Sequence, residues 1–366
     1  MSKTIRTLLL GLVGAFALSS AGTALAAYTS AALRVTDDRT SVTIRYTVNA
    51  ADDPTAKLTF YAPTGYTATL NQPAGTTLGT VTAQGTATDL AGALLPLTGT
   101  VQARAANGTF TSSPGSTPTP LAAAATQCTG TPTHTAFWVL ILQAAGQTLE
   151  LPAFVDAPAA GAGTSAFAAA SIQACLPPPD VPAGTPGRAT FGFKLTQVDF
   201  KVNGVFTSAG TGQPRWRVLA TPYTPARGTP NAAGSVEAQS VIAFPRTLTL
   251  RKPVVRTARG VATLAITGAA QLPAGAPAAL RLYRGKTAGG LTPSVTLSRS
   301  GAAFRGTLRI RQTTKRQIVF LQARAVVSAG TTTCTPTFGV PCLSASRAAV
   351  NVRSGTVRVV IPGRKR

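Results

Sequence analysis

Acidic residues are missing from the last third of this chain. The 366 residues include 34 Lys and Arg but only 10 Asp and Glu, for a net charge of +24. Every acid lies at or before Glu237, so residues 243–366 carry 21 basic residues and no acidic one. Residues 27–242 carry 11 basic and 10 acidic residues. The last segment therefore offers no carboxylate pair for glycoside hydrolysis and no histidine base, and its one-sign charge favours an anionic partner.

Histidine is almost as scarce, since His134 is the only one in the chain. A serine hydrolase of the common type would add a G-x-S-x-G nucleophile elbow, and the sequence contains none. The cysteines also lack the two-to-four-residue spacing of zinc ligands. We therefore expect no cofactor, a protein that is not an enzyme, and a loop position for His134 beside a disulfide. A secreted hydrolase with its site in the N-terminal region is the alternative.

Two acidic pairs, Asp37/Asp38 and Asp52/Asp53, decide between these readings. Aspartate suits turns, where its side chain caps backbone N–H groups. The pairs could also meet in space as catalytic carboxylates, or as a calcium site without EF-hand spacing. Convergence in a cleft would favour the hydrolase, whereas capping of separate turns would favour a protein without catalytic activity.

Long hydrophobic runs are absent beyond the N-terminus, where the pattern is that of a signal peptide. Lys3 and Arg6 precede the apolar stretch Leu8–Leu18, and Ala24-Leu25-Ala26 supplies the small residues of a cleavage site. The stretch is shorter than the roughly 20 residues of a membrane span. Residues 1–26 are therefore predicted to be removed, which places the protein outside the cell or at its envelope.

Only four cysteines occur, an even number that suits an oxidising compartment. Three pairings are possible. Cys334 and Cys342 flank a short Thr/Pro/Gly loop that costs little entropy to close. That choice leaves Cys128 to pair with Cys175.

Charged helix formers are also few, because only 12% of residues are charged, whereas Thr/Val-rich runs punctuated by Gly and Pro are frequent. We therefore predict an all-β protein with two β-sandwich-like modules. Residues 27–242 form the larger one, with a Pro-rich crossover loop at 176–187. Apolar strands over 136–143 and 147–154 predict a hairpin, and Asn203-Gly204 predicts a second one between 199–202 and 205–207.

Residues 243–363 are predicted to form the second module, followed by a basic tail at 364–366. Short strands are expected at 255–256, 261–266, 279–283, 295–298, 303–310, 317–327 and 348–361. In the spacing of their predicted strands and turns, residues 246–361 resemble the immunoglobulin-like and fibronectin-type modules of bacterial secreted proteins. The resemblance implies a β-sandwich that binds a partner or acts as a spacer.

The basic residues of this module are the candidate site. In Leu308-Arg309-Ile310-Arg311 the strand period puts both arginines on one face. Lys315 and Arg316 follow at the next turn, and Arg353 and Arg358 extend the charge. A solvated face would ordinarily mix both signs. We therefore expect non-specific binding to an anionic cell-wall polymer, an acidic polysaccharide or extracellular DNA, with a spacer lacking any ligand as a further alternative.

Two tryptophans, Trp138 and Trp216, could stack on a sugar. Both lie in apolar strand contexts, which favours burial in a β core. Arg215 and Arg217 flank Trp216 and are expected on the opposite face of its strand.

Overall fold

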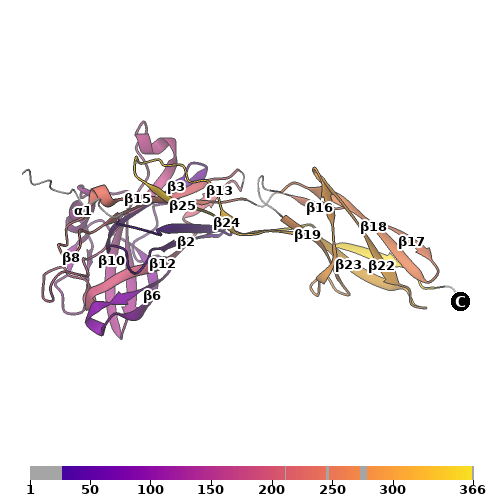
Figure 1. Cartoon of the computed structure of the whole chain (residues 1–366), viewed down its shortest axis with the longest axis horizontal. Coiled ribbons are helices and arrows are strands. Elements are labelled where there is room, and N and C mark those ends of the chain that lie inside the picture. The colour runs from indigo at the N-terminus through magenta and orange to yellow at the C-terminus, as the bar shows by residue number, and fades with distance from the viewer. Residues whose placement is uncertain (1–26, 211, 245–246, 273–277, 365–366) are drawn as a thin grey trace, which may run out of the picture.

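The computed structural model describes residues 27–210, 212–244, 247–272 and 278–364 (Figure 1). The predicted signal peptide, residues 1–26, and the last two residues of the basic tail lie outside them. Strands dominate, so the all-β prediction is confirmed. The helical elements are short: α1 (Leu121–Thr129), η1 (Thr88–Leu90), η2 (Gly163–Ala166), η3 (Thr190–Gly192) and η4 (Ala232–Gly234).

A thirteen-stranded sheet contains most of the strands before residue 242. In spatial order its members are β1 (Ala32–Asp37), β2 (Ser41–Thr47), β12 (Phe193–Asn203), β5 (Thr77–Ala87), β6 (Ala93–Arg104), β9 (Ala136–Ala144), β10 (Gln147–Asp156), β11 (Ala168–Cys175), β3 (Thr55–Pro63), β14 (Arg215–Pro222), β15 (Val236–Val241), β25 (Cys342–Arg347) and β24 (Gly330–Thr331). The sheet curls until β1 lies beside β15 and β25. Hydroxyls join these strands, because the Val35 amide donates to Ser240 Oγ (2.8 Å) and Ser344 Oγ donates to the Ala31 carbonyl (2.8 Å).

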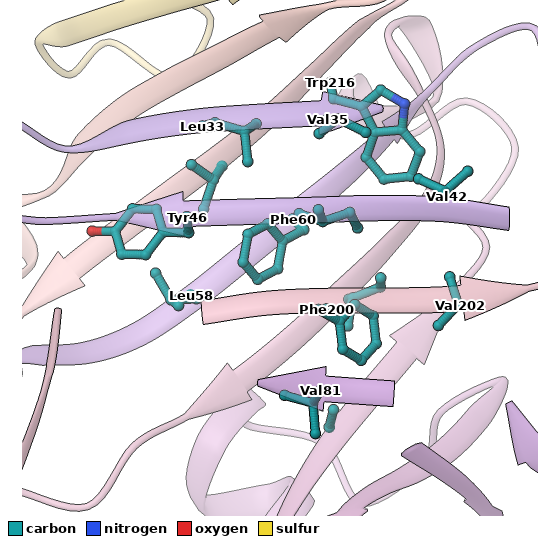
Figure 2. Close-up of a cluster of buried hydrophobic side chains, with 14 of the residues drawn as sticks. Leu33, Val35, Val42, Tyr46, Leu58, Phe60, Val81, Phe200, Val202 and Trp216 are labelled. Carbon is teal, nitrogen blue, oxygen red and sulfur yellow. The ribbon is translucent and has the colours of Figure 1, made fainter. Parts of the chain in front are cut away.

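Apolar side chains at every second position of the strands fill the inside of this curled sheet. In β2 this alternation turns Val42, Ile44 and Tyr46 inward, where they meet Trp216 and Phe60 (Figure 2). Trp138 and Trp216 are both fully buried, so neither forms an exposed sugar platform. Helix α1 covers the outer side of β9 and β10 with a separate apolar cluster, made of Leu121, Ala124, Ala125, Phe137, Val139 and Phe154.

The two predicted hairpins have different outcomes. The first is present as β9 and β10, joined by Ala145 and Gly146, both with positive φ (47° and 77°) as a type I′ turn requires. The second prediction was wrong. After Asn203-Gly204 the chain forms β13 (Phe206–Ser208), which pairs with β4 (Tyr66–Ala68). Strand β12 cannot accept β13 because β2 and β5 already occupy both of its edges.

Helix α1 and the short pair β7 (Thr109–Phe110) and β8 (Thr119–Pro120) lie in a stretch where no regular structure was predicted. The helix begins after Pro120 and ends at Gly130, whose φ of 82° is the left-handed conformation that commonly stops a helix.

Strands within residues 248–270, 278–327 and 350–361 form two five-stranded sheets at the other end of the molecule (Figure 1). One contains β16 (Leu248–Leu250), β18 (Val261–Ala270), β22 (Ala303–Arg311) and β21 (Ser298–Ser300), with β17 (Val254–Ala258) also paired to β18. The other contains β20 (Thr292–Thr296), β19 (Ala278–Gly285), β23 (Gln317–Val327) and β26 (Val350–Arg353), with β27 (Val357–Ile361) also paired to β23. One apolar cluster holds residues of both sheets, among them Leu264, Ile266, Leu282 and Leu321. The single strand predicted at 348–361 is interrupted, because Ser354 bonds to the backbone of Ala323 and separates β26 from β27.

The interval Gly330–Arg347, within the predicted second module, pairs with the thirteen-stranded sheet. Strand β25 runs parallel to β15. Between β24 and β25, the backbone N–H of Thr337 donates to the buried carboxylate of Glu237 (2.7 Å), and the Phe338 ring contacts Tyr61 (4.9 Å between centroids). Both disulfides have the predicted pairing: Cys334–Cys342 closes this loop, and Cys128–Cys175 joins α1 to β11.

Candidate polyanion-binding faces

The first basic face is the outer surface of the sheet that contains β22, and we define it by Arg256, Arg305, Arg309 and Arg311. Strand β22 buries Phe304, Leu308 and Ile310, so the arginines between them are exposed. Arg256 on β17 and Arg309 on β22 both pair with Thr263, which puts them in one row across the sheet. Positive side chains from neighbouring strands therefore share one surface.

A shallow groove of about 410 Å³ lies at one end of the first basic face. Arg251 and Arg305 line it, together with the hydroxyl-bearing residues Thr267, Ser298 and Ser300. Ser298, Arg305 and Thr267 are directly opposite one another on β21, β22 and β18. Guanidinium and hydroxyl donors that converge in a groove can bind a phosphate, sulfate or carboxylate group.

The second basic face is the outer surface of the other sheet, and we define it by Arg281, Arg324, Arg353 and Arg358. Arg281, Arg324 and Arg353 are in register on the adjacent strands β19, β23 and β26. Adjacent strands are about 4.8 Å apart, so three like charges stand in a row about 10 Å long. Like charges directly opposite each other destabilise a sheet, and an anion bound between them would relieve the repulsion.

Aromatic residues accompany the arginines of the second basic face. The Arg324 guanidinium lies over the Tyr283 ring, 4.1 Å from its centroid. Half-buried Phe320 is directly opposite Arg358 on β27. The stacking orders the Arg324 side chain without neutralising its charge, so the guanidinium edge can still donate hydrogen bonds.

Within the described ranges, no carboxylate forms an ion pair with an arginine of either face. Each ion pair among the described residues lies between Arg45 and Glu237 in the sequence. The groove arginines Arg251 and Arg305 likewise have no acidic partner in the described part of the chain. Their positive charge is therefore available to an external ligand.

The structure divides the six arginines and lysines that the sequence singled out. Arg309 and Arg311 lie on the first basic face, and Arg353 and Arg358 lie on the second. Lys315 and Arg316 are exposed in the turn that joins β22 to β23. A single flat ligand cannot touch all six, because the two outer faces point away from a shared core.

Sequence reasoning missed five arginines of the two faces and the groove: Arg251, Arg256, Arg281, Arg305 and Arg324. Alternation in β19 and β23 could have found two of them, because Leu280 and Leu282 flank Arg281, and Ala323 and Ala325 flank Arg324. The alternation shows which face of its own strand each arginine occupies, but not the cross-strand register that puts arginines of different strands side by side.

The two acidic pairs stay apart. Asp38 lies in the turn between β1 and β2, where Thr40 and Ser41 donate hydrogen bonds to it. Desolvation of this exposed carboxylate opposes its ionisation, but the hydrogen bonds outweigh that effect and lower the pKa of Asp38 to about 2. Asp52 and Asp53 follow β2, at the opposite end of that hairpin about 20 Å away. The carboxylate constellation that a hydrolase site would need from these pairs is not formed.

Asp52 and Asp53 instead share a polar cluster with Lys194. Burial raises the pKa of Asp53, Lys194 opposes that rise, and Asp180 and Asp52 add to it. The Lys194 ammonium donates to the carbonyls of Ala50 (2.8 Å) and Asp52. These contacts fix the turn between β2 and β3, a structural role.

His134 makes a network that the sequence did not reveal. Its Nδ1 is 2.7 Å from Asp156 Oδ2, and its Nε2 is 2.9 Å from Thr129 Oγ1. This order of hydroxyl, imidazole and carboxylate has the outline of a nucleophile–base array. However, Thr129 Oγ1 also donates to the Ala125 carbonyl (2.9 Å), and the imidazole is 1% exposed beneath the Phe154 ring. The network therefore ties the end of α1 to β10 rather than presenting a nucleophile to solvent.

No family model and no curated protein matches this sequence. The described residues contain no group of three or more His, Cys, Asp or Glu placed to hold a metal ion. None of the helices in the described ranges has the length and apolar character needed to cross a bilayer.

Proposed function

We propose that the protein is exported and attaches to an anionic polymer of the cell envelope or its surroundings, without catalysing a reaction. The proposal includes two β-sandwich-like modules, residues 27–242 and 243–363, with Gly330–Arg347 of the second paired to the sheet of the first. The second, immunoglobulin-like module makes the attachment. A single observation carries the proposal: Arg281, Arg324 and Arg353 stand opposite one another, and none of them forms an ion pair with a carboxylate of the described residues. Such a row costs stability unless an anion occupies it.

The ligand class follows from the arrangement of the charges. Arg309 and Arg311 are two residues apart along a strand, about 6.6 Å, and the row on the second basic face repeats at about 4.8 Å. Charges spaced in this way on extended surfaces suit a linear polymer with an anionic group on each repeat. The groove between Arg251 and Arg305 would hold one such group.

The attachment is tested with the mature chain, residues 27–366, and a purified anionic wall polymer as the probe. One variant replaces Arg305, Arg309 and Arg311 by Gln, and a second replaces Arg281, Arg353 and Arg358 by Gln. The matched control replaces Arg34, Lys201 and Arg227 by Gln, three exposed basic residues of the thirteen-stranded sheet region. All three variants lose the same net charge.

We expect at least one face variant to bind at least about tenfold more weakly than the control. Its plot of log affinity against log salt should be shallower by about 2 to 3, because each lost contact removes about 0.7 to 0.9 from the slope. Equal losses in all three variants would mean that net charge alone causes binding, and the assignment to these faces would be wrong.

A further inference from the structure

The interior of the thirteen-stranded sheet contains a cavity of about 140 Å³. Side chains from β3, β5, β6, β9, β10, β11 and β12 line it, and nearly all of them are apolar. Figure 2 shows four of these, Leu58, Phe60, Val81 and Phe200, within the buried cluster. The cavity thus lies far from the two basic faces, in a different part of the molecule.

A void of this size is unusual in a folded protein. Protein interiors are close-packed, and gaps larger than a water molecule are few. An apolar cavity of about 150 Å³ stays dry and takes up benzene. The cavity therefore has the size and the chemistry to hold one small apolar molecule.

The polar groups of the cavity wall indicate that the ligand is uncharged. Glu150 is the one charged residue that lines it. Its carboxylate already accepts hydrogen bonds from Arg104 Nη2 (3.0 Å) and from the Thr111 amide (2.6 Å). A charged ligand would find no unpaired opposite charge there, and burying its charge without a partner would be unfavourable.

Apolar side chains form the part of the cavity wall that meets solvent. Leu149, Leu151, Leu176 and Phe191 line the cavity and are each partly exposed to solvent. Phe191 has a φ of 58°, a left-handed conformation that is strained for an aromatic residue. Such strain persists only where the surroundings fix the backbone.

Hydrogen bonds of Arg188, three residues before Phe191, fix the backbone at this position. The Arg188 guanidinium makes two hydrogen bonds of 2.7 Å to the Asp89 carboxylate, and its Nε donates to the Val181 carbonyl (2.8 Å). These bonds fasten the loop that carries Phe191 to η1, on the turn that joins β5 to β6. The loop therefore holds a partly exposed aromatic side chain in the wall of the cavity.

We propose that this cavity is a binding site for one uncharged apolar molecule, an aromatic ring or a short hydrocarbon chain, that enters past Phe191. The site is independent of the polyanion attachment, so either could exist without the other. A cavity-filling substitution gives the direct test: Ala174→Phe places a ring into the lining of β11. The matched control is Ala279→Phe, the same change at an exposed position of β19.

Benzene is the probe, and calorimetry of the mature chain measures its binding. We expect binding with a stoichiometry of one, an affinity at least about tenfold weaker in Ala174→Phe, and no change in Ala279→Phe. Leu142→Ala, which enlarges the cavity, should bind naphthalene more tightly than the unmodified protein does. This variant decides the matter if Ala174→Phe fails to fold.

Absence of benzene binding at its aqueous saturation would overturn the proposal. Unchanged binding in a folded Ala174→Phe variant would also overturn it, because the probe would then be bound elsewhere. An enlarged Leu142→Ala cavity that gains no affinity for naphthalene would contradict it as well.

Discussion

Removing the outer two charges of the arginine row should stabilise the protein and weaken its binding to an anionic polymer. The double variant Arg281→Gln with Arg353→Gln abolishes both like-charge pairs, since each residue is directly opposite Arg324. It leaves the contact of Arg324 with the Tyr283 ring intact. The variant therefore isolates the repulsion from the stacking.

The magnitude follows from the number of opposed pairs. Favourable cross-strand pairs contribute about 0.2 to 1 kcal/mol each, so repulsion of the same size in two like-charge pairs amounts to about 0.4 to 2 kcal/mol in dilute salt. These side chains are partly or fully exposed, and salt screens exposed charges over about 10 Å at 0.1 M and about 3 Å at 1 M. The gain should therefore shrink towards zero in about 1 M NaCl.

Urea unfolding of the mature chain at low and high salt measures this gain. Arg284→Gln combined with Lys286→Gln is the charge-matched control, because Arg284 is opposite Leu321 and Thr292 and exposed Lys286 follows the end of β19. We expect the double variant to gain stability at low salt only, and the control to gain less. If the double variant is less stable than the unmodified protein at low salt, the row is not repulsive and the reasoning fails.

Three other predictions concern the thirteen-stranded sheet. Glu237→Ala should lower the free energy of unfolding by about 3 kcal/mol, because Arg217 and the Thr337 amide lose a fully buried acceptor. A loss below about 1 kcal/mol in urea titrations would contradict this prediction. Replacing Cys128 and Cys175 by Ala should lower the free energy of unfolding by about 4 kcal/mol, and replacing Cys334 and Cys342 should lower it by about 2.5 kcal/mol, because the first bridge closes the longer loop. Calorimetric scans that reverse this order would refute the loop-entropy argument. The pKa of Asp38 is lowered in the folded state, so the stability that it contributes is complete above its unfolded-state pKa near 3.8 and is lost as the pH falls towards 2. An Asp38→Asn variant should lose less stability between these pH values. A pH profile identical to that of the unmodified protein would exclude the effect.

Local patterns in the sequence predicted what depends on a few adjacent residues. Alternation in Leu308-Arg309-Ile310-Arg311 correctly put both arginines on the exposed face of β22. The apolar strands around Ala145-Gly146 correctly predicted the β9–β10 hairpin, because that turn and its two strands are contiguous.

Features that depend on partners far along the chain were not predictable in this way. Asn203-Gly204 has the composition of a hairpin turn, yet the availability of both edges of β12 is decided by β2 and β5. The row on the second basic face needs the register of β19, β23 and β26, which the sequence does not state. The same limit applies to Gly330–Arg347, whose partner strand β15 lies about a hundred residues earlier.

The most direct test of the central proposal is the salt dependence of binding of the mature chain to isolated cell envelope. The account predicts binding at low salt and a linear fall of log affinity with log salt, with a slope of about −3 or steeper, as expected for four or more ionic contacts. Absence of binding at low salt, or an affinity that does not change with salt, would contradict it.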